Sequence, residues 1–195
     1  ARLFIFKKMK KLYVVGNKAS KSLSPTIFNY WFKKYNIKAR YGYLELTEKN
    51  FHNKIKDVLE KKDTLGLNVT IPFKNKIIKH LGKIDTHAKK IGAVNCVTNK
   101  KTINGTNTDW TGYYKTLPNI KQTKNRKVII LGYGGASHAI HYVLKKRGFK
   151  DILIFNRSKK KIKYSKNTEY TKKYSDLETH LEGVFLIINT TPINP

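Results

Sequence analysis

The fold is decided by one stretch of the chain, Lys127-Val128-Ile129-Ile130-Leu131-Gly132-Tyr133-Gly134-Gly135-Ala136. After its opening lysine comes an uninterrupted apolar run, which is typical of a parallel strand covered on both faces. Glycines follow at once, and a helical pattern then extends from about Ala136 to Lys146, with Gly148 as its expected C-cap. With further apolar strands at 152–155 and 183–189, the order strand, helix, strand predicts a doubly wound α/β domain.

The glycine loop has the form G-x-G-x-x-S, in which Ser137 replaces the third glycine. Gly132 permits the tight turn, and Gly134 lets backbone N–H groups approach a pyrophosphate at the N-terminus of the helix. Ser137 is still small enough for the helix and the strand to pack closely. Because a strand precedes the loop and a helix follows it, we predict a dinucleotide site rather than a structural turn, formed by Gly132, Gly134, Gly135 and Ala136.

The residues after the next strand indicate which dinucleotide is bound. A site that prefers NAD usually has Asp or Glu here for the ribose 2′-hydroxyl, whereas this chain has Asn156-Arg157-Ser158-Lys159-Lys160-Lys161. Arg157 can stack on the adenine and pair with a 2′-phosphate. We therefore predict NADP, with Asn156, Arg157, Ser158 and Lys161 at the cofactor. The alternative is that this is one more basic run in a lysine-rich chain.

The remainder of the chain also alternates strands and helices. Ser24 is the expected N-cap of a helix with Pro25 at its first position, and a short helix is expected after Pro72. Other strands are expected at 11–15, 41–46, 65–70, 93–98 and 101–105, and another helix over 51–59. We expect a substrate-binding α/β domain over 9–109, a connection over 110–126, and an incomplete Rossmann-like NADP-binding domain over 127–195. Residues 1–8 are interpreted as an extension ahead of Met9.

Composition narrows the class of protein. The 195 residues include 41 Lys and Arg against 12 Asp and Glu, a net charge of +29 that brings nucleic-acid binding into consideration. These basic residues are spread along the chain, and no helix-turn-helix, zinc-finger spacing or RNP-type motif accompanies them. We therefore expect a solvated cationic surface and no specific nucleic-acid partner. A single cysteine, Cys96, and the lack of a secretory signal or an 18-residue apolar run favour a cytoplasmic location without a membrane.

Two histidines raise the question of a metal. His138 and His141 are three residues apart on the helix after the glycine loop, but no cysteine or carboxylate lies nearby at ligand spacing. We expect a packed or solvent-facing pair and no metal.

Seven motifs, taken in order and with their spacing, resemble the shikimate dehydrogenase family. They cover nearly the whole chain from Leu12, and together they are specific although each is moderate alone. They are Gly16-Asn17 with Ser22-Leu23-Ser24-Pro25, Asn68-Val69-Thr70-Ile71-Pro72-Phe73-Lys74, Gly92-Ala93-Val94-Asn95, Asn107-Thr108-Asp109, Gly132-Tyr133-Gly134-Gly135-Ala136, Asn156-Arg157-Ser158 and Asn189-Thr190-Thr191-Pro192.

That family reduces 3-dehydroshikimate to shikimate with NADPH in aromatic amino-acid biosynthesis. The resemblance implies that Lys74, held by Asp109, is the acid/base. It also implies that the substrate carboxylate and ring hydroxyls are bound by Ser22, Ser24, Thr70, Asn95 and Asp109. The implied carboxylate site is physically reasonable, because neutral serine hydroxyls at the positive N-terminal end of a helix can bind a carboxylate. The carboxyl end of a strand is also where open α/β sheets place ligands.

The chain departs from the family pattern at a few positions. Lys18 and Lys21 stand where Pro and His are usual, and Cys96 stands where Thr or Ser is usual. Family members also continue well beyond Pro192, so we expect this sequence to be part of a longer chain. Two alternatives stay open, a quinate/shikimate dehydrogenase with broader cofactor use and a basic nucleic-acid-binding protein. The sequence does not decide between a monomer and a homodimer.

Overall fold

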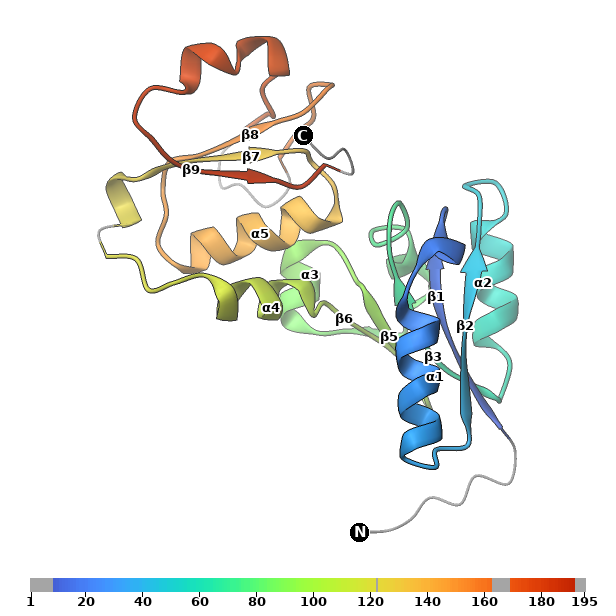
Figure 1. Ribbon diagram of the computed structural model, residues 1–195. Coiled ribbons are helices and arrows are strands. Elements are labelled where there is room, and N and C mark those ends of the chain that lie inside the picture. The colour runs from blue at the N-terminus through green and yellow to red at the C-terminus, as the bar shows by residue number, and fades with distance from the viewer. Residues whose placement is uncertain (1–8, 122, 163–168, 192–195) are drawn as a thin grey trace. The chain divides into compact units, whose positions relative to one another are not determined.

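The computed structural model describes residues 9–121, 123–162 and 169–191 (Figure 1). The expected extension over 1–8 and the last residue of the final motif, Pro192, lie outside the described residues. The chain forms two compact units. The first comprises the residues up to Asp85 together with Val94–Thr106, and the second comprises Thr86–Ala93 and the chain from Asn107 onward.

The first unit is built on a six-stranded sheet in the order β2-β1-β3-β5-β6-β4. In the parallel centre of this sheet, β1 lies between β2 and β3. Val15 of β1 is paired with Leu44 of β2 and with Val69 of β3. β5 and β6 form an antiparallel extension of this centre, and β4 pairs with β6. The strands are β1 (Lys10–Gly16), β2 (Ala39–Glu45), β3 (Thr64–Val69), β4 (Lys83–Ile84), β5 (Cys96–Asn99) and β6 (Ile103–Thr106).

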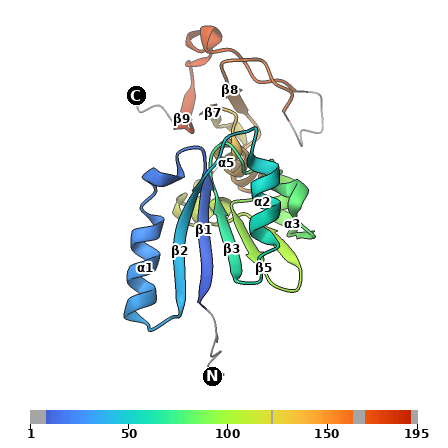
Figure 2. The ribbon, with the colours of Figure 1, turned by 90° about the vertical axis from the view of Figure 1, so that its right-hand side faces the viewer.

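Two helices cover opposite faces of this parallel centre, α1 (Ser24–Lys34) and α2 (Phe51–Leu59) (Figures 1 and 2). This arrangement follows from the strand order, because β2 and β3 lie on different sides of β1. The right-handed connections from β1 to β2 and from β2 to β3 therefore cross the sheet on opposite faces. Short 3-10 helices, η1 (Ala19–Lys21) and η2 (Ile77–His80), follow β1 and the Lys74 segment. On the α2 side, the rings of Phe51 and Phe73 stack with centroids 4.2 Å apart.

The expected cap of α1 is wrong by one residue. Ser24 is the first residue of the helix, and Leu23 is its N-cap, with backbone angles φ −77° and ψ −10°. The carbonyl of Leu23 accepts the N–H of Ile27 at 3.1 Å. Ser22 takes the role of the cap side chain, since its Oγ accepts the N–H of Ser24 at 3.2 Å.

The second unit contains a parallel three-stranded sheet in the order β8-β7-β9, formed by β7 (Lys127–Leu131), β8 (Ile152–Phe155) and β9 (Val184–Asn189). Helix α5 (Gly135–Lys146) lies on one face, and η4 (Tyr174–Asp176) and η5 (Glu178–His180) lie on the other (Figure 1). The predicted strands and the helix after the glycine loop are confirmed. Gly148 follows α5 with a left-handed φ of +89°, as expected at the end of a helix.

Two further helices pack against α5 in this unit, α3 (Thr86–Ile91) and α4 (Asp109–Thr116). The sequence did not predict α3 or β4, whereas it predicted a helix within the connection over 110–126, where most of α4 lies. The unit has a continuous apolar core whose fully buried members come from β7, β8, α5 and the turn after α5. They include Val128, Ile130, Val143, Leu144 and Phe149.

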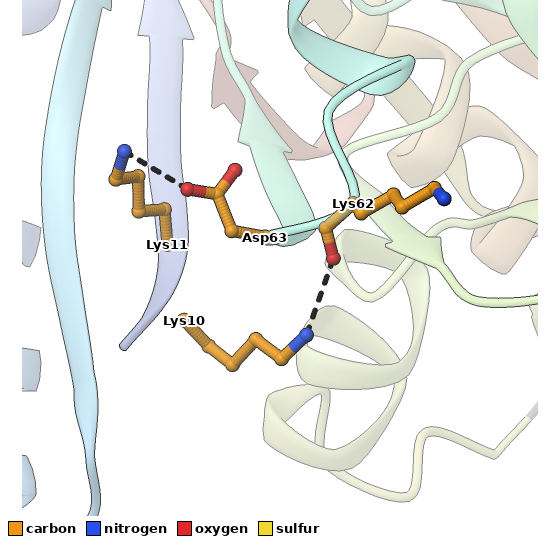
Figure 3. A network of polar contacts seen from close by, with 4 residues as sticks. All are labelled: Lys10, Lys11, Lys62 and Asp63. Atoms are coloured by element: carbon orange, nitrogen blue, oxygen red, sulfur yellow. Dashed lines mark hydrogen bonds and ion pairs between the residues drawn. The ribbon is translucent and has the colours of Figure 1, made fainter. Parts of the chain in front are cut away.

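A polar network joins β1 to the turn before β3 at the amino-terminal end of the first sheet (Figure 3). The Lys11 Nζ lies 3.0 Å from a carboxylate oxygen of Asp63, and the Lys10 Nζ donates to the carbonyl of Lys62 at 3.2 Å. The start of β1 is thereby joined to the turn that enters β3. This network lies at the end of the sheet opposite the serine motif, which follows the carboxyl end of β1.

Candidate functional site

In the first unit, the carboxyl ends of β1 and β3 lie against one another. A side chain at Gly16 would collide with the methyl group of Thr70, so only glycine lets the two strand ends approach this closely. The N–H of Thr70 donates to the carbonyl of Val15 at 2.8 Å, and the N–H of Asn17 donates to the carbonyl of Ile71 at 3.2 Å. Thr70 is therefore held beside the segment that leads to the serine motif.

The two serines of that motif contact each other. Ser22 Oγ lies 3.1 Å from Ser24 Oγ, and both side chains are half-buried. The turn before them is fastened to β2 by Glu45, whose carboxylate accepts hydrogen bonds from the backbone N–H and the hydroxyl of Ser20. These hydrogen bonds, the hydroxyl first, lower the pKa of Glu45. The serine pair is thus held in place from both the helix and the sheet.

Lys74 and Asn95 are placed by backbone hydrogen bonds around the end of β3. Phe73 is fully buried and its N–H donates to the carbonyl of Thr70 at 2.9 Å. The carbonyl of Lys74 accepts the N–H of Val94 at 2.8 Å, and the carbonyl of Asn95 accepts the N–H of Val69 at 2.9 Å. The first unit therefore brings Thr70, Lys74 and Asn95 to the same end of its sheet.

Asp109 belongs to the second unit, where it is the first residue of α4. The start of this helix is fixed by the buried side chain of Asn107. Its Nδ2 donates to the carbonyl of Ala93 at 2.9 Å, and its Oδ1 accepts the N–H of Trp110 at 3.3 Å. Asn107 stands in a predicted motif, but only its buried contacts reveal this anchoring role. The pairing of Asp109 with Lys74 joins residues of different units and stays a prediction.

The glycine loop lies at the carboxyl end of the second sheet. Gly132 has a φ of +98°, and a side chain there would crowd the Thr190 hydroxyl, which donates to the carbonyl of Leu131 at 2.7 Å. At Gly134, the N-cap of α5, a side chain would meet nothing within 4 Å. Open space and the N–H groups of the first turn of a helix suit a pyrophosphate. Ser137 is fully buried, as expected for a small residue between helix and strand.

Next to this loop, the end of β8 carries the basic run. Leu131 pairs with Phe155, so Gly132 and Asn156 start neighbouring loops at one sheet edge. The Asn156 Nδ2 donates to the carbonyl of Ser158 at 2.9 Å and so shapes the turn. Arg157, Ser158 and Lys161 are exposed. The structure brings the glycine loop and the turn that starts at Asn156 to one edge of the sheet, and cations but no acid follow β8 in the sequence.

The histidine pair on α5 lies beside a cavity of about 90 Å³ lined by Lys90, Ile91, Tyr133, His138, His141, Tyr142 and Lys145. His138 is buried, and burial followed by the charge of Lys145 lowers the pKa of His141 to about 4. Within the described part of the chain, no group of three or more His, Cys, Asp or Glu side chains could hold a metal ion. Likewise, none of the helices described combines the length and apolar character needed to cross a bilayer.

The fold and these two sets of residues define a class, the two-domain α/β oxidoreductases that bind a dinucleotide. Comparison with known proteins makes the assignment specific. Residues 14–97 match the family described as shikimate dehydrogenase substrate binding domain, and residues 115–193 match the family described as shikimate / quinate 5-dehydrogenase. The chain belongs to the shikimate dehydrogenase family, with an N-terminal substrate domain and a Rossmann-like domain.

Individual relatives agree with this assignment. A shikimate dehydrogenase (NADP(+)) of Clostridium botulinum is 38% identical over 185 residues, which cover 92% of this chain and 70% of that protein. The crystal structure of shikimate dehydrogenase 1 from Peptoclostridium difficile has a TM-score of 0.81 at 30% identity, covering 95% of this chain and 68% of that one. Shikimate 5-dehydrogenase from Thermus thermophilus, in complex with NADP(H) and shikimate, has a TM-score of 0.64 at 26% identity, with coverages of 77% and 57%.

Proposed function

We propose that this chain catalyses the reversible, NADP-dependent reduction of 3-dehydroshikimate to shikimate, a step of aromatic amino-acid biosynthesis. The observation that carries the proposal is the convergence of the serine pair, Thr70, Lys74 and Asn95 at one end of the first sheet. This set lies in the unit that includes most of the region matching the substrate-binding family. The names and ligands of the relatives support the substrate and the cofactor.

In this proposal each residue has a defined task. Ser22 and Ser24 donate hydrogen bonds to the substrate carboxylate at the N-terminus of α1, where the helix dipole also favours negative charge. Thr70, Asn95 and Asp109 orient the ring hydroxyls. When bound, NADPH supplies the hydride that reduces the carbonyl carbon. Lys74 gives its proton to the carbonyl oxygen as negative charge develops there, and Asp109 keeps the ammonium group charged and oriented.

The chain's own residues fit NADP at the second sheet. Gly132, Gly134, Gly135 and Ala136 offer backbone N–H groups at the start of α5, and Arg157 offers a planar guanidinium to the 2′-phosphate. Asn156 shapes the turn that presents Arg157, while Ser158 and Lys161 add a hydroxyl and a second cation. A cytoplasmic location and a monomeric or homodimeric state are further predictions that go with this reaction.

The reaction is tested by the initial rate of nicotinamide absorbance change with shikimate or quinate against NADP or NAD, in all four pairings. We expect a strong preference for shikimate with NADP. Comparable rates with quinate would favour the broader quinate/shikimate enzyme, which the description of the second matching family also covers. If the full-length protein produced no absorbance change in any of the four pairings, the proposal would be contradicted.

Replacing the acid/base tests the mechanism. Lys74→Ala should lower kcat by about 100-fold to 10,000-fold, because general acid catalysis contributes roughly that much. Lys76→Ala is the matched control, since Lys76 lies on the same segment and pairs with Glu48 at 2.8 Å instead of serving the reaction. Near-normal turnover of Lys74→Ala would remove the proton-transfer role from this residue.

The cofactor preference is tested at Arg157. Arg157→Ala should lower kcat/KM for NADP by roughly tenfold to 100-fold, because a charge-assisted hydrogen bond contributes about 1.5–3 kcal/mol and 1.4 kcal/mol corresponds to a factor of ten. The value for NAD should stay nearly constant. Lys173→Ala, an exposed cation of the same unit outside the basic run, should leave the NADP to NAD ratio unchanged. An unchanged ratio in Arg157→Ala would refute the assignment.

A further inference from the structure

The cavity in the second unit lies where α3 packs against α5. Its volume is about 90 Å³, and it is lined by the end of α3, by one face of α5 and by Tyr133 of the glycine loop. Two lysines and two histidines are among the described residues that line it, and none of these residues carries a carboxylate. No residue predicted to bind the substrate or the 2′-phosphate of the cofactor lines it. The lining side chains therefore form a set of their own.

The two lysines of the cavity come from different helices. Lys90 is the next-to-last residue of α3, Lys145 is the next-to-last residue of α5, and both are exposed. Within the described part of the chain, neither lysine forms an ion pair with a carboxylate. Two cations that line one cavity produce a positive potential there, and the surrounding walls concentrate it.

The two histidines are more enclosed than the lysines. His138 is buried, and its ring lies against that of Tyr133 with centroids 4.6 Å apart, whereas His141 is half-buried. Tyr142, also on α5, has its hydroxyl 2.7 Å from Nδ1 of His87. Ammonium groups, imidazoles and phenols are all able to donate hydrogen bonds to an anion. The cavity is therefore rich in donors and contains no competing acid.

The volume and the charge of the cavity indicate what it holds. A metal cation would be repelled by the two ammonium groups. One water needs about 10–15 Å³ of such a volume, so there is room for a tetrahedral oxyanion of the size of phosphate. Two ammonium groups also balance the charge of a dianion and form strong hydrogen bonds to its oxygens.

We propose that this cavity binds a small inorganic oxyanion, such as phosphate, between Lys90 and Lys145 and against the imidazole of His141. The site goes beyond the proposed function, because its occupant takes no part in the transfer of hydride or proton to the substrate. It joins the end of α3, which leads into Gly92, to the helix that follows the glycine loop. A bound anion would thus stabilise the packing of α3 against α5.

The binding of the anion is coupled to the protonation of His141. Burial, followed by the charge of Lys145, lowers the pKa of His141 to about 4, and Glu169 acts in the opposite direction. A bound oxyanion offsets the Lys145 charge and favours the imidazolium, so it raises this pKa. The anion must then bind more tightly as pH falls through the raised pKa. The other titratable groups at the cavity are those of Lys90, Tyr133, His138 and Tyr142.

Isothermal titration calorimetry of the full-length protein with sodium phosphate tests the site, at an ionic strength held constant with chloride. Lys90→Met combined with Lys145→Met should weaken phosphate binding by roughly tenfold to 100-fold, because charge-assisted hydrogen bonds are lost. Lys89→Met combined with Lys146→Met is the matched control, since it removes the same charge from adjacent positions that do not line the cavity. All four lysines are exposed, so neither pair of substitutions disturbs the core. An equal loss in the two pairs, or no saturable binding of phosphate, would overturn the proposal.

Sulfate tests the coupling to His141, because it stays a dianion over a range in which phosphate titrates. It should bind more tightly at about pH 5.5 than at about pH 8, and His141→Gln should remove most of this difference. His180→Gln is the control, since His180 belongs to the same unit and does not line the cavity. A pH dependence that is unchanged in His141→Gln would overturn the placement of the anion against this imidazole.

Two further titrations separate this site from other places that attract phosphate groups. With NADP at saturation, the affinity for phosphate should change by less than about twofold. Loss of binding would place the anion at the cofactor residues and overturn the proposal. Glycerol 3-phosphate should bind more weakly than phosphate, because its carbon chain exceeds the cavity, and tighter binding of the ester would overturn the assignment to an inorganic anion. Titrations without substrate fail or succeed independently of the proposed function.

Discussion

At the scale of single residues, His141 shows how partial burial and a neighbouring cation act on an imidazole. Its ring lines the cavity between α3 and α5, where Lys145 is one turn further along α5. Burial lowers its pKa most, Lys145 lowers it further, and Glu169 acts in the opposite direction. The result is a pKa of about 4 in place of the ordinary 6.5, so this histidine is neutral at physiological pH.

This shift makes stability depend on pH in a defined window. Because the folded pKa lies below the unfolded value, the unfolded chain binds more protons between about pH 6.5 and 4, and the folded state loses stability as pH falls through that window. The full effect is on the order of 3 kcal/mol. Urea unfolding measured between pH 7 and 4 should show a shallower loss for His141→Gln. Lys145→Met should raise the pKa of His141, whereas Lys146→Met should not, and equal behaviour of the two lysine variants would contradict this account.

At the scale of elements, the close approach of neighbouring strands limits which side chains the first sheet can accommodate. A side chain at Gly66 on β3 would collide with the carbonyl of Val97 on β5, whereas one at Gly112 in α4 would meet nothing within 4 Å. Gly66→Ala should therefore lower the free energy of unfolding by about 1–3 kcal/mol through overpacking. Gly112→Ala should raise it by roughly 0.5–1 kcal/mol, because alanine favours a helix over glycine. Both are measured by urea unfolding, and the same sign for the two variants would refute the argument.

The elements that the sequence predicted are those with a strong local pattern. β7 and β8 are continuous apolar strands, and α5 has a glycine loop before it and a left-handed glycine after it. By contrast, α3 has six residues and β4 has two, which is too short for a periodic signal to appear. Such elements are defined by packing against neighbours that are distant in sequence.

The residues of the candidate site also fall into two groups, those that the sequence predicts and those that only the structure reveals. Lys74 and Arg157 are predicted from the sequence because each lies in a short motif, and their roles in the reaction stay predictions. The contact between Tyr41 and Asn68 could not be predicted, because these residues are 27 positions apart and meet only across the sheet. The same holds for Glu45, which reaches the serine motif through Ser20. Residues that hold a site in place are found only when strand order and register are known.

At the scale of the whole molecule, net charge sets the response to salt. The chain carries +29, so cations far outnumber the carboxylates available to pair with them. Such an excess destabilises the compact state by self-repulsion. It also predicts weak, sequence-independent attraction to polyanions such as DNA, with an affinity that falls steeply as salt is added. Specific recognition would require contacts with base edges, and no nucleic-acid-binding motif in the sequence offers them.

Salt should accordingly stabilise this protein. The Debye length falls from about 30 Å at 0.01 M to about 3 Å at 1 M ionic strength, so repulsion among the lysines is largely screened. If screening recovers about 1–2 kcal/mol, the apparent midpoint of thermal unfolding should rise by roughly 2–8 °C between these conditions in sodium chloride. Sucrose at matched osmolality is the uncharged control and should not reproduce the dependence on ionic strength.

Ion pairs such as Lys76 with Glu48 are weakened by the same screening. A midpoint that falls with added chloride would therefore show that attraction between paired charges outweighs the repulsion, contrary to the expectation from net charge.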